Sequence, residues 1–424
     1  MTTIASSLAT FGYAPVLAFT RRDQPVDARR RMTAPAQLDE VRARFSAAPD
    51  SQLAQAARVA LRPAGRAGDG APAARADGAR VYPNLGVVYG TVDRDGLAAL
   101  RASPDVVRVT IAPQLSLIRP IASTAGTPRA GTSWGIEALG IPELWAAGLT
   151  GRGVRVAHLD TGVDAGHPAL ADAVAAFTEF DHGGLEVPGA TARDSDLRDG
   201  HGTHTAGTIA GRPVRRRRVG VAPGAALYSS MVVEGGDVIA RILAGMNWAV
   251  GEGVRVLSVS LGIRGYVGDF LGLIQVLRDS GVLPVVAVGN EGPGTSRSPG
   301  NYPRVLSVGY YTPQQTVADS SSSQRFPRRS QPLVPDVVAP GEGVVSARAG
   351  GGWRTLSGSS MAVPHLAGLA ALLLEARPTA TVAQLERAML ASAQLGALAP
   401  DRANRGAVHG PRALAALPLS RPRP

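Results

Sequence analysis

The sequence predicts an α/β protein: a doubly wound, mostly parallel sheet with helices on both faces, preceded by a small α/β sandwich. Apolar runs without polar alternation, such as Val254–Leu261 and Val282–Val288, recur from residue 133 onward. Helical stretches, such as Val238–Val250, separate them. Continuous apolar strands that alternate with helices are typical of a parallel sheet that is covered on both faces.

Length and composition agree with this fold. The chain has 424 residues, enough for two or three domains, and 45% hydrophobic against 18% charged residues is the balance of a globular protein. It has no cysteine, which excludes disulfides and thiol nucleophiles. The formal net charge is +11, and all 44 basic residues are arginines. A polyanion site is the alternative to a basic solvated surface, but no nucleic-acid-binding motif accompanies the charge, so no nucleic-acid partner is expected.

The first 118 residues predict the small sandwich. Its expected elements are, in order, a strand at Pro15–Thr20, one or two helices within Ala36–Leu61, a strand at Leu85–Val92, a helix at Asp95–Ala102 and a strand at Val106–Ile111. The stretch 62–80 is rich in Ala, Gly and Arg without periodicity and predicts a loop. Strands that alternate with helices over so short a length favour a small separate domain.

A linker is predicted at residues 119–133, because Arg119–Thr132 has no apolar period and holds two Pro, two Gly and four Thr or Ser. Residues 134–395 are expected to form the main domain. Residues 396–424, rich in Pro, Arg and Ala, predict a loosely held tail. No run reaches the ~18 apolar residues that span a bilayer, so no membrane span is expected. No basic residue precedes the apolar start, so no clear signal peptide is predicted and a cytoplasmic location is compatible with the sequence.

Three short segments carry chemistry-bearing residues. An apolar strand ends abruptly at Asp160, and the carboxyl ends of parallel strands are where ligand sites form. His201 and His204 lie among small residues at the start of a predicted helix. Ser360 precedes the helical run Met361–Glu375, where free N–H groups and the helix dipole stabilise negative charge.

Each segment alone has a simpler interpretation. The carboxylate could cap a loop, the serine could cap a helix, and the two histidines could bind a metal, although no third ligand of suitable type lies near them. Together they occur in the order Asp, His, Ser. Acyl transfer from a serine needs a base within hydrogen-bond reach and a carboxylate that fixes the tautomer of the base. The combination therefore indicates a serine hydrolase and no catalytic metal.

These segments also resemble a known family. DTGVD (160–164), HGTHTAG (201–207) and GSSMAVPH (358–365) are similar to the three active-site signatures of the subtilisin-like serine proteases, peptidase family S8. The resemblance covers residues 134–395. It implies the subtilisin-like fold and a serine endopeptidase that acts on polypeptide substrates.

The resemblance assigns Asp160, His201 and Ser360 as a catalytic triad that hydrolyses peptide bonds through an acyl-enzyme on the serine. It requires no cofactor. Structural calcium stays open, because many members bind it through surface oxygens, although no twelve-residue EF-type loop occurs in this sequence. The alternatives are a peptidase dedicated to one precursor and an inactive relative that serves as a binding module.

The resemblance also implies substrate-binding residues. The VGNEG segment after an apolar strand assigns the side chain of Asn290, with the backbone N–H of Ser360, to the oxyanion hole, where they stabilise charge that appears only in the tetrahedral intermediate. The substrate pairs as an extended strand. The positions assigned to this binding are Ser260, Leu261 and Gly262 at the pairing edge and Ala287 and Gly289 at an open, apolar first pocket, with Gly235 and Gly236 at the opposite edge.

Residues 15–118 resemble the inhibitory pro-domain of the family in element order and size. The apolar start is then its first strand, the pro-domain is an intramolecular inhibitor, and the processing site lies within 119–133. Secretion is implied by the family as the alternative to a cytoplasmic location. One departure is Asp319–Pro335, which lacks the Phe-Ser-x-x-Gly pattern common there and carries extra arginines.

Overall fold

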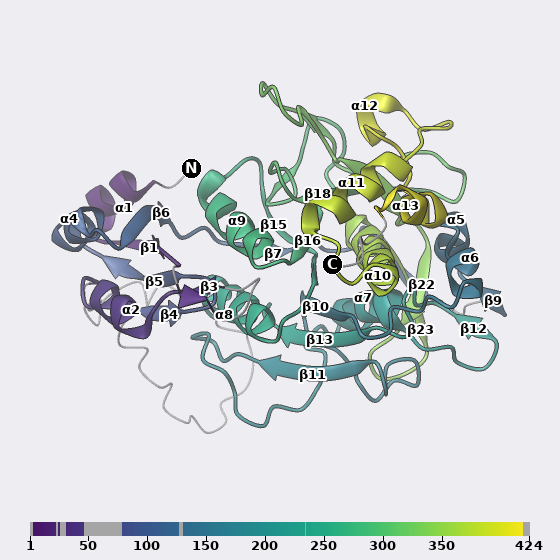
Figure 1. Cartoon of the computed structure of the whole chain (residues 1–424), viewed down its shortest axis with the longest axis horizontal. Coiled ribbons are helices and arrows are strands. Elements are labelled where there is room, and N and C mark those ends of the chain that lie inside the picture. The colour runs from purple at the N-terminus through teal and green to yellow at the C-terminus, as the bar shows by residue number, and fades with distance from the viewer. Residues whose placement is uncertain are drawn as a thin grey trace, which may run out of the picture.

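The computed structural model describes residues 3–22, 24–25, 31–45, 79–126, 130–233 and 235–418. A large sheet with helices on both faces forms the main body, and a smaller sheet from the N-terminal part of the chain lies beside helices α8 and α9 (Figure 1). The predicted α/β architecture, with its large parallel sheet, is confirmed.

Seven parallel strands form the central sheet. Their order is β11 (Val174–Glu179), β13 (Ala226–Met231), β10 (Arg155–Asp160), β14 (Val256–Val259), β16 (Leu283–Ala287), β18 (Leu306–Tyr311) and β21 (Val337–Pro340). From β10 the chain builds β11 and β13 on one side and then crosses to β14 on the other. Asp160 ends β10 at this reversal of strand order, where open α/β sheets form their ligand crevice.

Helices bury both faces of this sheet. One face is covered by α5 (Trp134–Ala138), α6 (Ile141–Ala146), α7 (His201–Ala210), α10 (Ser359–Ala376), α11 (Val382–Ser392) and α13 (Gly410–Ala416), and the other by α8 (Val238–Gly251) and α9 (Leu271–Asp279). Alternate residues of one strand serve the two cores: Val285 and Ala287 of β16 belong to the first and Val286 to the second. This explains why the sheet strands are apolar without alternation.

Helix α10 crosses the larger core. Among the described residues it is the one helix long and apolar enough to span a membrane, but 89% of the relevant window is buried inside the protein. Its apolar surface is therefore satisfied by the sheet and the neighbouring helices.

The N-terminal sheet is antiparallel, in the order β4 (Arg80–Tyr82), β5 (Val87–Val92), β1 (Ala14–Thr20) and β6 (Val106–Ile111). Its helices are α1 (Ile4–Phe11), α2 (Pro35–Arg42) and α4 (Arg94–Ala102), and β2 (Gln24–Pro25) pairs with β3 (Arg31–Met32) beside it. The apolar start, predicted as the first strand, instead forms α1 before β1, with Thr3 in a capping box at its N-terminus. Of the helices predicted within Ala36–Leu61, α2 ends at Arg42, and residues 46–78 lie outside the described part.

Strand β1 is buried on both faces. Val16 and Ala18 pack among the helices of the N-terminal sheet, whereas Leu17 and Phe19 belong to the core formed with α8 and α9. Gly272 of α9 admits the ring of Phe19, because a Cβ at Gly272 would lie 2.7 Å from it. The second face of the small sheet is thus buried against the main domain.

Polar contacts fix this docking along α8. The hydroxyl of Tyr82 donates to the carbonyl of Ala240 (3.1 Å), and the hydroxyl of Tyr89 donates to Asp237 Oδ2 (2.7 Å). Asp237 is also the N-cap of α8. Tyr89 therefore binds the N-cap residue of α8, and this contact sets the position of the small sheet along the helix.

The segment that follows β6 pairs with the main domain at three places. β7 (Ser116–Leu117) is antiparallel to β15 (Leu261–Arg264), β8 (Ala122–Ala125) is antiparallel to β23 (Trp353–Ser357), and β9 (Gly131–Thr132) is parallel to β12 (Arg217–Arg218). The unpatterned linker predicted at 119–133 therefore carries strands. Its composition gives no sign of them, because the pairing partners lie far away in the sequence.

Two further predictions differ from the structure. The single run Val254–Leu261 is divided into β14 and β15, with Ser260 between them. The tail predicted as loosely held from residue 396 instead contains α12 (Pro400–Ala403) and α13, and it buries Leu398, Ala413 and Leu417. Leu398, Val408 and Leu417 are buried although they stand singly in a Pro/Arg/Ala-rich segment, so the composition conceals their packing.

Candidate active site

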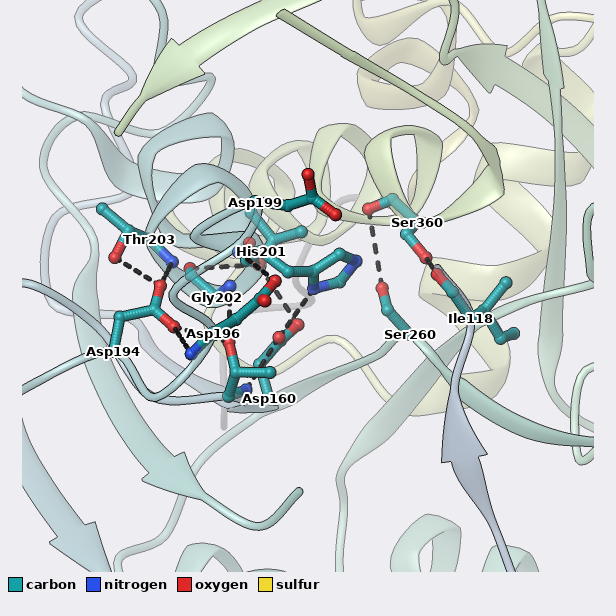
Figure 2. A network of polar contacts seen from close by, with 12 residues as sticks. Ile118, Asp160, Asp194, Asp196, Asp199, His201, Gly202, Thr203, Ser260 and Ser360 are labelled. Atoms are coloured by element: carbon teal, nitrogen blue, oxygen red, sulfur yellow. Dashed lines mark hydrogen bonds and ion pairs between the residues drawn. The ribbon is translucent and has the colours of Figure 1, made fainter. Parts of the chain in front are cut away.

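Asp160 and His201 are in direct contact. Asp160 ends β10 and His201 begins α7, and Asp160 Oδ1 accepts hydrogen bonds from His201 Nδ1 (2.7 Å) and from the backbone N–H of Thr161 (2.8 Å) (Figure 2). Both side chains are buried. A buried carboxylate needs such donors, because water does not solvate it.

The two groups change each other's pKa. Burial acts to raise the pKa of Asp160, but the charge and hydrogen bond of His201 outweigh it, so the pKa lies below its usual range. Burial acts to lower the pKa of His201, and the nearby charge and hydrogen bond of Asp160 raise it above its usual range. The pair therefore favours an ionised carboxylate beside an imidazole that accepts a proton readily.

The second ring nitrogen of His201 is available for chemistry. Within the described part of the chain, Nε2 is buried and has no hydrogen-bond partner. In Figure 2 the imidazole points from Asp160 toward the side of the site where Ser360 lies. The hydroxyl of Ser360 does not bond to this ring: it donates to the backbone carbonyl of Ile118 (2.8 Å).

Ser360 is the second residue of α10, where helix geometry leaves backbone N–H groups unpaired. Pro364, four residues further on, has no N–H to donate to the carbonyl of Ser360. The hydroxyl of Ser260 donates to that carbonyl instead (3.5 Å). The backbone of Ser360 is thus hydrogen-bonded to Ser260, a residue of the predicted substrate-binding edge.

Asn290 reaches the same place from the end of β16. Its Oδ1 accepts hydrogen bonds from the backbone N–H and the hydroxyl of Ser359 (both 2.8 Å), and its Nδ2 donates to the carbonyl of Arg119 (3.0 Å). Gly358 leaves room for this amide, since a Cβ there would lie 2.8 Å from Nδ2. Ser359 therefore fixes the amide so that its N–H groups face the linker.

The predicted substrate edge binds residues 116–118 of the same chain, directly before the linker. Leu261 and Gly262 pair with Leu117 and Ser116, and the carbonyl of Ser260 accepts a hydrogen bond from the N–H of Ile118 (3.0 Å). The side chain of Ile118 is 1% exposed and lies in the same core cluster as Ala287.

The remaining predicted pocket positions face elsewhere. A Cβ at Gly289 would meet Glu291, Ser322 and Arg297, and Gly235 and Gly236 face His182. The pairing with residues 116–118 is thus made by the Ser260–Gly262 edge.

Arg119 introduces charge next to the serine. Its Nη1 lies 3.4 Å from Asp196 Oδ1 and 4.0 Å from Asp199 Oδ2. Asp196 is buried, and its Oδ2 accepts a hydrogen bond from the backbone N–H of His201 (3.2 Å). The sequence predictions do not include these two carboxylates, although Asp196 and Asp199 lie shortly before His201 in the chain.

His158 and Thr205 were also missed. Both are buried beside Asp160: His158 Nε2 lies 2.8 Å from Thr205 Oγ1, which lies 3.2 Å from Asp160 Oδ2. Each stands two or four residues from a predicted catalytic residue, inside or next to the quoted motifs. That spacing is the signal that could have found them.

His204 does not join a metal site with His201. Its Nε2 bonds to the backbone carbonyl of Val344 (2.9 Å), and burial lowers its pKa to about 3. Over the described ranges, no group of three or more His, Asp or Glu side chains is arranged to hold a metal ion. The two histidines of the motif thus have separate surroundings.

The chain is similar to known proteins over more than half of its length. The subtilase family model (peptidase S8) matches residues 151–410, more than half of the chain. Subtilisin E of Bacillus subtilis (strain 168) is 36% identical over 260 residues, which cover 59% of this chain and 63% of the relative. The major intracellular serine protease of the same strain is 35% identical over 249 residues (56% and 74%), and M-protease of Shouchella clausii (strain KSM-K16) is 34% identical over 277 (65% and 68%). The match thus spans slightly less than two thirds of subtilisin E, and the chain belongs to the subtilase family.

Proposed function

We propose that the protein is a serine endopeptidase that hydrolyses peptide bonds through an acyl-enzyme on Ser360, with Asp160 and His201 completing the triad. His201 Nε2 takes the proton of Ser360 Oγ as that oxygen attacks the carbonyl carbon, and then gives it to the leaving amine. Asp160 keeps the other ring proton on Nδ1 and stabilises the imidazolium. Water next attacks the acyl-enzyme, and the same imidazole acts as its base.

One observation carries the proposal. The hydroxyl of Ser360 lies 2.8 Å from the carbonyl oxygen of Ile118, in a peptide that Ser260 already holds as an extended strand. A nucleophile beside a positioned carbonyl is the arrangement that acyl transfer needs. The unpartnered Nε2 of His201 supplies a base, and the amide of Asn290 supplies an oxyanion donor at the next carbonyl.

These contacts favour Ile118–Arg119 as the bond that the enzyme cleaves in its own chain. Ile118 has both the serine contact and a buried side chain, which fits an apolar first pocket. The alternative is the bond between Arg119 and Pro120, since Asn290 donates to the carbonyl of Arg119. The nitrogen of the Arg119–Pro120 bond is part of the proline ring. The ring carbons hinder the approach of the acid that must protonate this nitrogen when the bond breaks. A shift of the linker by one carbonyl would bring Ile118 to Asn290.

On the leaving side we propose that Asp196 and Asp199 favour a basic residue. The guanidinium of Arg119 contacts both carboxylates at 3.4 and 4.0 Å. The Arg119 side chain is 39% exposed, so solvent screens this attraction and its effect on affinity is modest. Preferred substrates are then extended polypeptides with an aliphatic residue before the cleaved bond and arginine after it.

We further propose that residues 1–118 form a pro-domain that inhibits the enzyme, and that residues 119–133 are the processed linker. The catalytic domain then begins at residue 134, and the packed residues 396–418 belong with 134–395. The docking of β1, Tyr82 and Tyr89 on α8 and α9 supports this assignment. So does the path of the linker, which enters the site as a strand paired with β15.

Expression of the full chain tests both proposals. Wild type, Ser360→Ala and Ser359→Ala are compared by intact mass, N-terminal fragment mass and labelling with a fluorophosphonate. Wild type should yield a fragment that begins at Arg119 and is labelled, Ser359→Ala should still be labelled, and Ser360→Ala should stay intact and unlabelled. Cleavage or labelling of Ser360→Ala would refute the assignment of the nucleophile. If wild type hydrolyses peptides while it remains full length, the N-terminal region is instead a permanent accessory domain.

A further inference from the structure

We infer that His158 and Thr205 are a positioning pair that holds the carboxylate of Asp160 in the orientation that His201 requires. The inference rests on the proposed roles of Asp160 and His201 as base-orienting acid and base. Neither His158 nor Thr205 contacts the linker in any described hydrogen bond, so both act through Asp160.

The pair follows from how one strand and one helix meet. His158 and Asp160 are two residues apart on β10 and therefore point to the same face of the sheet. His201 and Thr205 are four residues apart on α7 and lie one above the other on one face of the helix. The two rows pack together, so that His201 meets Asp160 (2.7 Å) and Thr205 meets His158 (2.8 Å).

The second carboxylate oxygen explains why the pair matters. Asp160 Oδ1 receives two donors, His201 Nδ1 and the N–H of Thr161. Within the part of the chain that the structure describes, the hydroxyl of Thr205 is the one hydrogen-bond donor to Oδ2 (3.2 Å). Without it a buried, charged oxygen would be unsatisfied, and the carboxylate could rotate away from His201.

The direction of the Thr205 proton depends on His158. Thr205 Oγ1 lies 3.2 Å from Asp160 Oδ2 and 3.1 Å from the carbonyls of His201 and Gly202, but it has one proton to give. If His158 Nε2 carries a hydrogen, it donates to Oγ1 and leaves that proton for the three acceptors. The charged oxygen is the strongest of them.

The contact of His158 with Ser229 is compatible with this tautomer. Ser229 is the register partner of His158 on β13, and its Oγ lies 3.0 Å from His158 Nδ1. A hydroxyl that donates to Nδ1 leaves the ring hydrogen on Nε2, where it faces Thr205. Burial lowers the pKa of His158 to about 4, so the ring is neutral near pH 7 and does not compete with His201 for the carboxylate.

Steady-state kinetics of the self-cleaved enzyme test the inference. Thr205→Val keeps the shape of the side chain without the hydroxyl, and Thr205→Ser keeps the hydroxyl. Thr205→Val should lower kcat by about 10- to 100-fold with little change in KM, because it removes a hydrogen bond to a charged group. Thr205→Ser should stay within about threefold of wild type if the hydroxyl is what matters.

The pH profile of kcat/KM separates positioning from general destabilisation. The charged and titratable groups that face His201 are Asp160, Asp194, Asp196, His158 and His204. Thr205→Val changes none of them. If the hydroxyl holds Asp160 in place, its loss weakens the Asp160–His201 contact, and the acid limb of the profile should move to lower pH. A merely structural role would leave that limb where it is.

Two further comparisons complete the test. His158→Leu should lower kcat as much as Thr205→Val does, and the double variant should lose little more kcat than either single variant. His158→Gln, which keeps an N–H donor, should recover most of the wild-type kcat. Ser230→Ala is the matched control, since it removes a buried hydroxyl from the neighbouring strand β13 that has no hydrogen-bond partner in the described part of the chain. Its kcat should stay within about twofold of wild type.

The inference is overturned if Thr205→Val keeps as much kcat as Ser230→Ala, or if Thr205→Val and Thr205→Ser lose equal kcat. It is also overturned if the losses of kcat from the His158 and Thr205 substitutions are fully additive in free energy. Should Thr205→Val fail to fold, His158→Leu against His158→Gln decides in its place, and equal kcat values for the two reject the pair. Absence of peptide hydrolysis in wild type would instead reject the proposed function.

Discussion

Replacement of Asn290 by alanine removes an amide whose two ends have different tasks. Nδ2 donates to the carbonyl of Arg119 at 3.0 Å. After the proposed shift of the linker by one carbonyl, the carbonyl of Ile118 would take this place, and negative charge would develop there during cleavage. Oδ1 accepts two hydrogen bonds of 2.8 Å from Ser359, at the start of α10. The substitution should therefore lower both the rate of the chemical step and the stability of the fold.

The two effects differ in size and in the quantity that reports them. A donor engaged only by the tetrahedral intermediate is generally worth about 10²- to 10³-fold in kcat, or about 3–4 kcal/mol, with little change in KM. The lost Ser359 contacts should cost about 1 kcal/mol each in the free energy of unfolding. Asn290→Asp separates the effects, because it keeps an acceptor for Ser359 but replaces the donor with negative charge. Its kcat should be at least as low as that of the alanine variant.

Peptide hydrolysis by the processed enzyme gives kcat and KM, and thermal unfolding in a Ser360→Ala background gives stability without self-digestion. An alanine variant that loses less than about tenfold in kcat would refute an oxyanion role for Asn290. A change confined to KM would mean that the amide binds the ground state of the substrate.

Three further predictions follow from the described contacts. In the pH profile of kcat/KM, the acid limb should lie above the ordinary histidine pKa of about 6.5, because the raised pKa of His201 keeps the base protonated to higher pH. An acid limb at or below that pH would contradict the Asp160–His201 contact. Arg119→Ala should slow self-cleavage about two- to fivefold and Arg119→Lys less, as followed by intact mass over time, and equal rates would contradict the proposed preference of Asp196 and Asp199 for a basic residue. Phe19→Ala should shorten the delay between self-cleavage and the onset of peptide hydrolysis by about tenfold or more, because it removes a large apolar contact with α9, and an unchanged delay would argue against inhibition by the docked sheet.

The sequence predicts the central sheet well because each strand is buried on both faces. The run Val282–Val288, for example, corresponds to β16 within one residue at each end. The sequence singles out Asp160, His201 and Ser360 as candidates because each stands where an element begins or ends. Such positions have local signals: an apolar run that stops, or small residues before a helix.

Contacts that depend on distant partners had no such signal. The residues of β8 are Ala-Ser-Thr-Ala, all exposed, and they form a strand because β23 offers hydrogen bonds from more than two hundred positions away. The link between His158 and Thr205 depends in the same way on how α7 packs against β10. Local periodicity reports which face of an element is buried, but the identity of its neighbour is a property of the tertiary fold.

The chain is held in place on both sides of Ile118, and this affects which step would limit the appearance of activity after self-cleavage. Upstream, the chain is held by β7 and by the apolar face of β1 on α8 and α9. Downstream, it is held by the contacts of Arg119 and by the four exposed residues of β8. After the proposed cleavage, the new amine of Arg119 would remain beside the acyl-enzyme, where it competes with water and favours resynthesis of the bond. Because the downstream strand buries less apolar surface, it should leave first and admit water. The carboxylate of Ile118 would then stay in the cleft on the docked N-terminal sheet, so release of that sheet, and not bond cleavage, would set the rate at which activity appears.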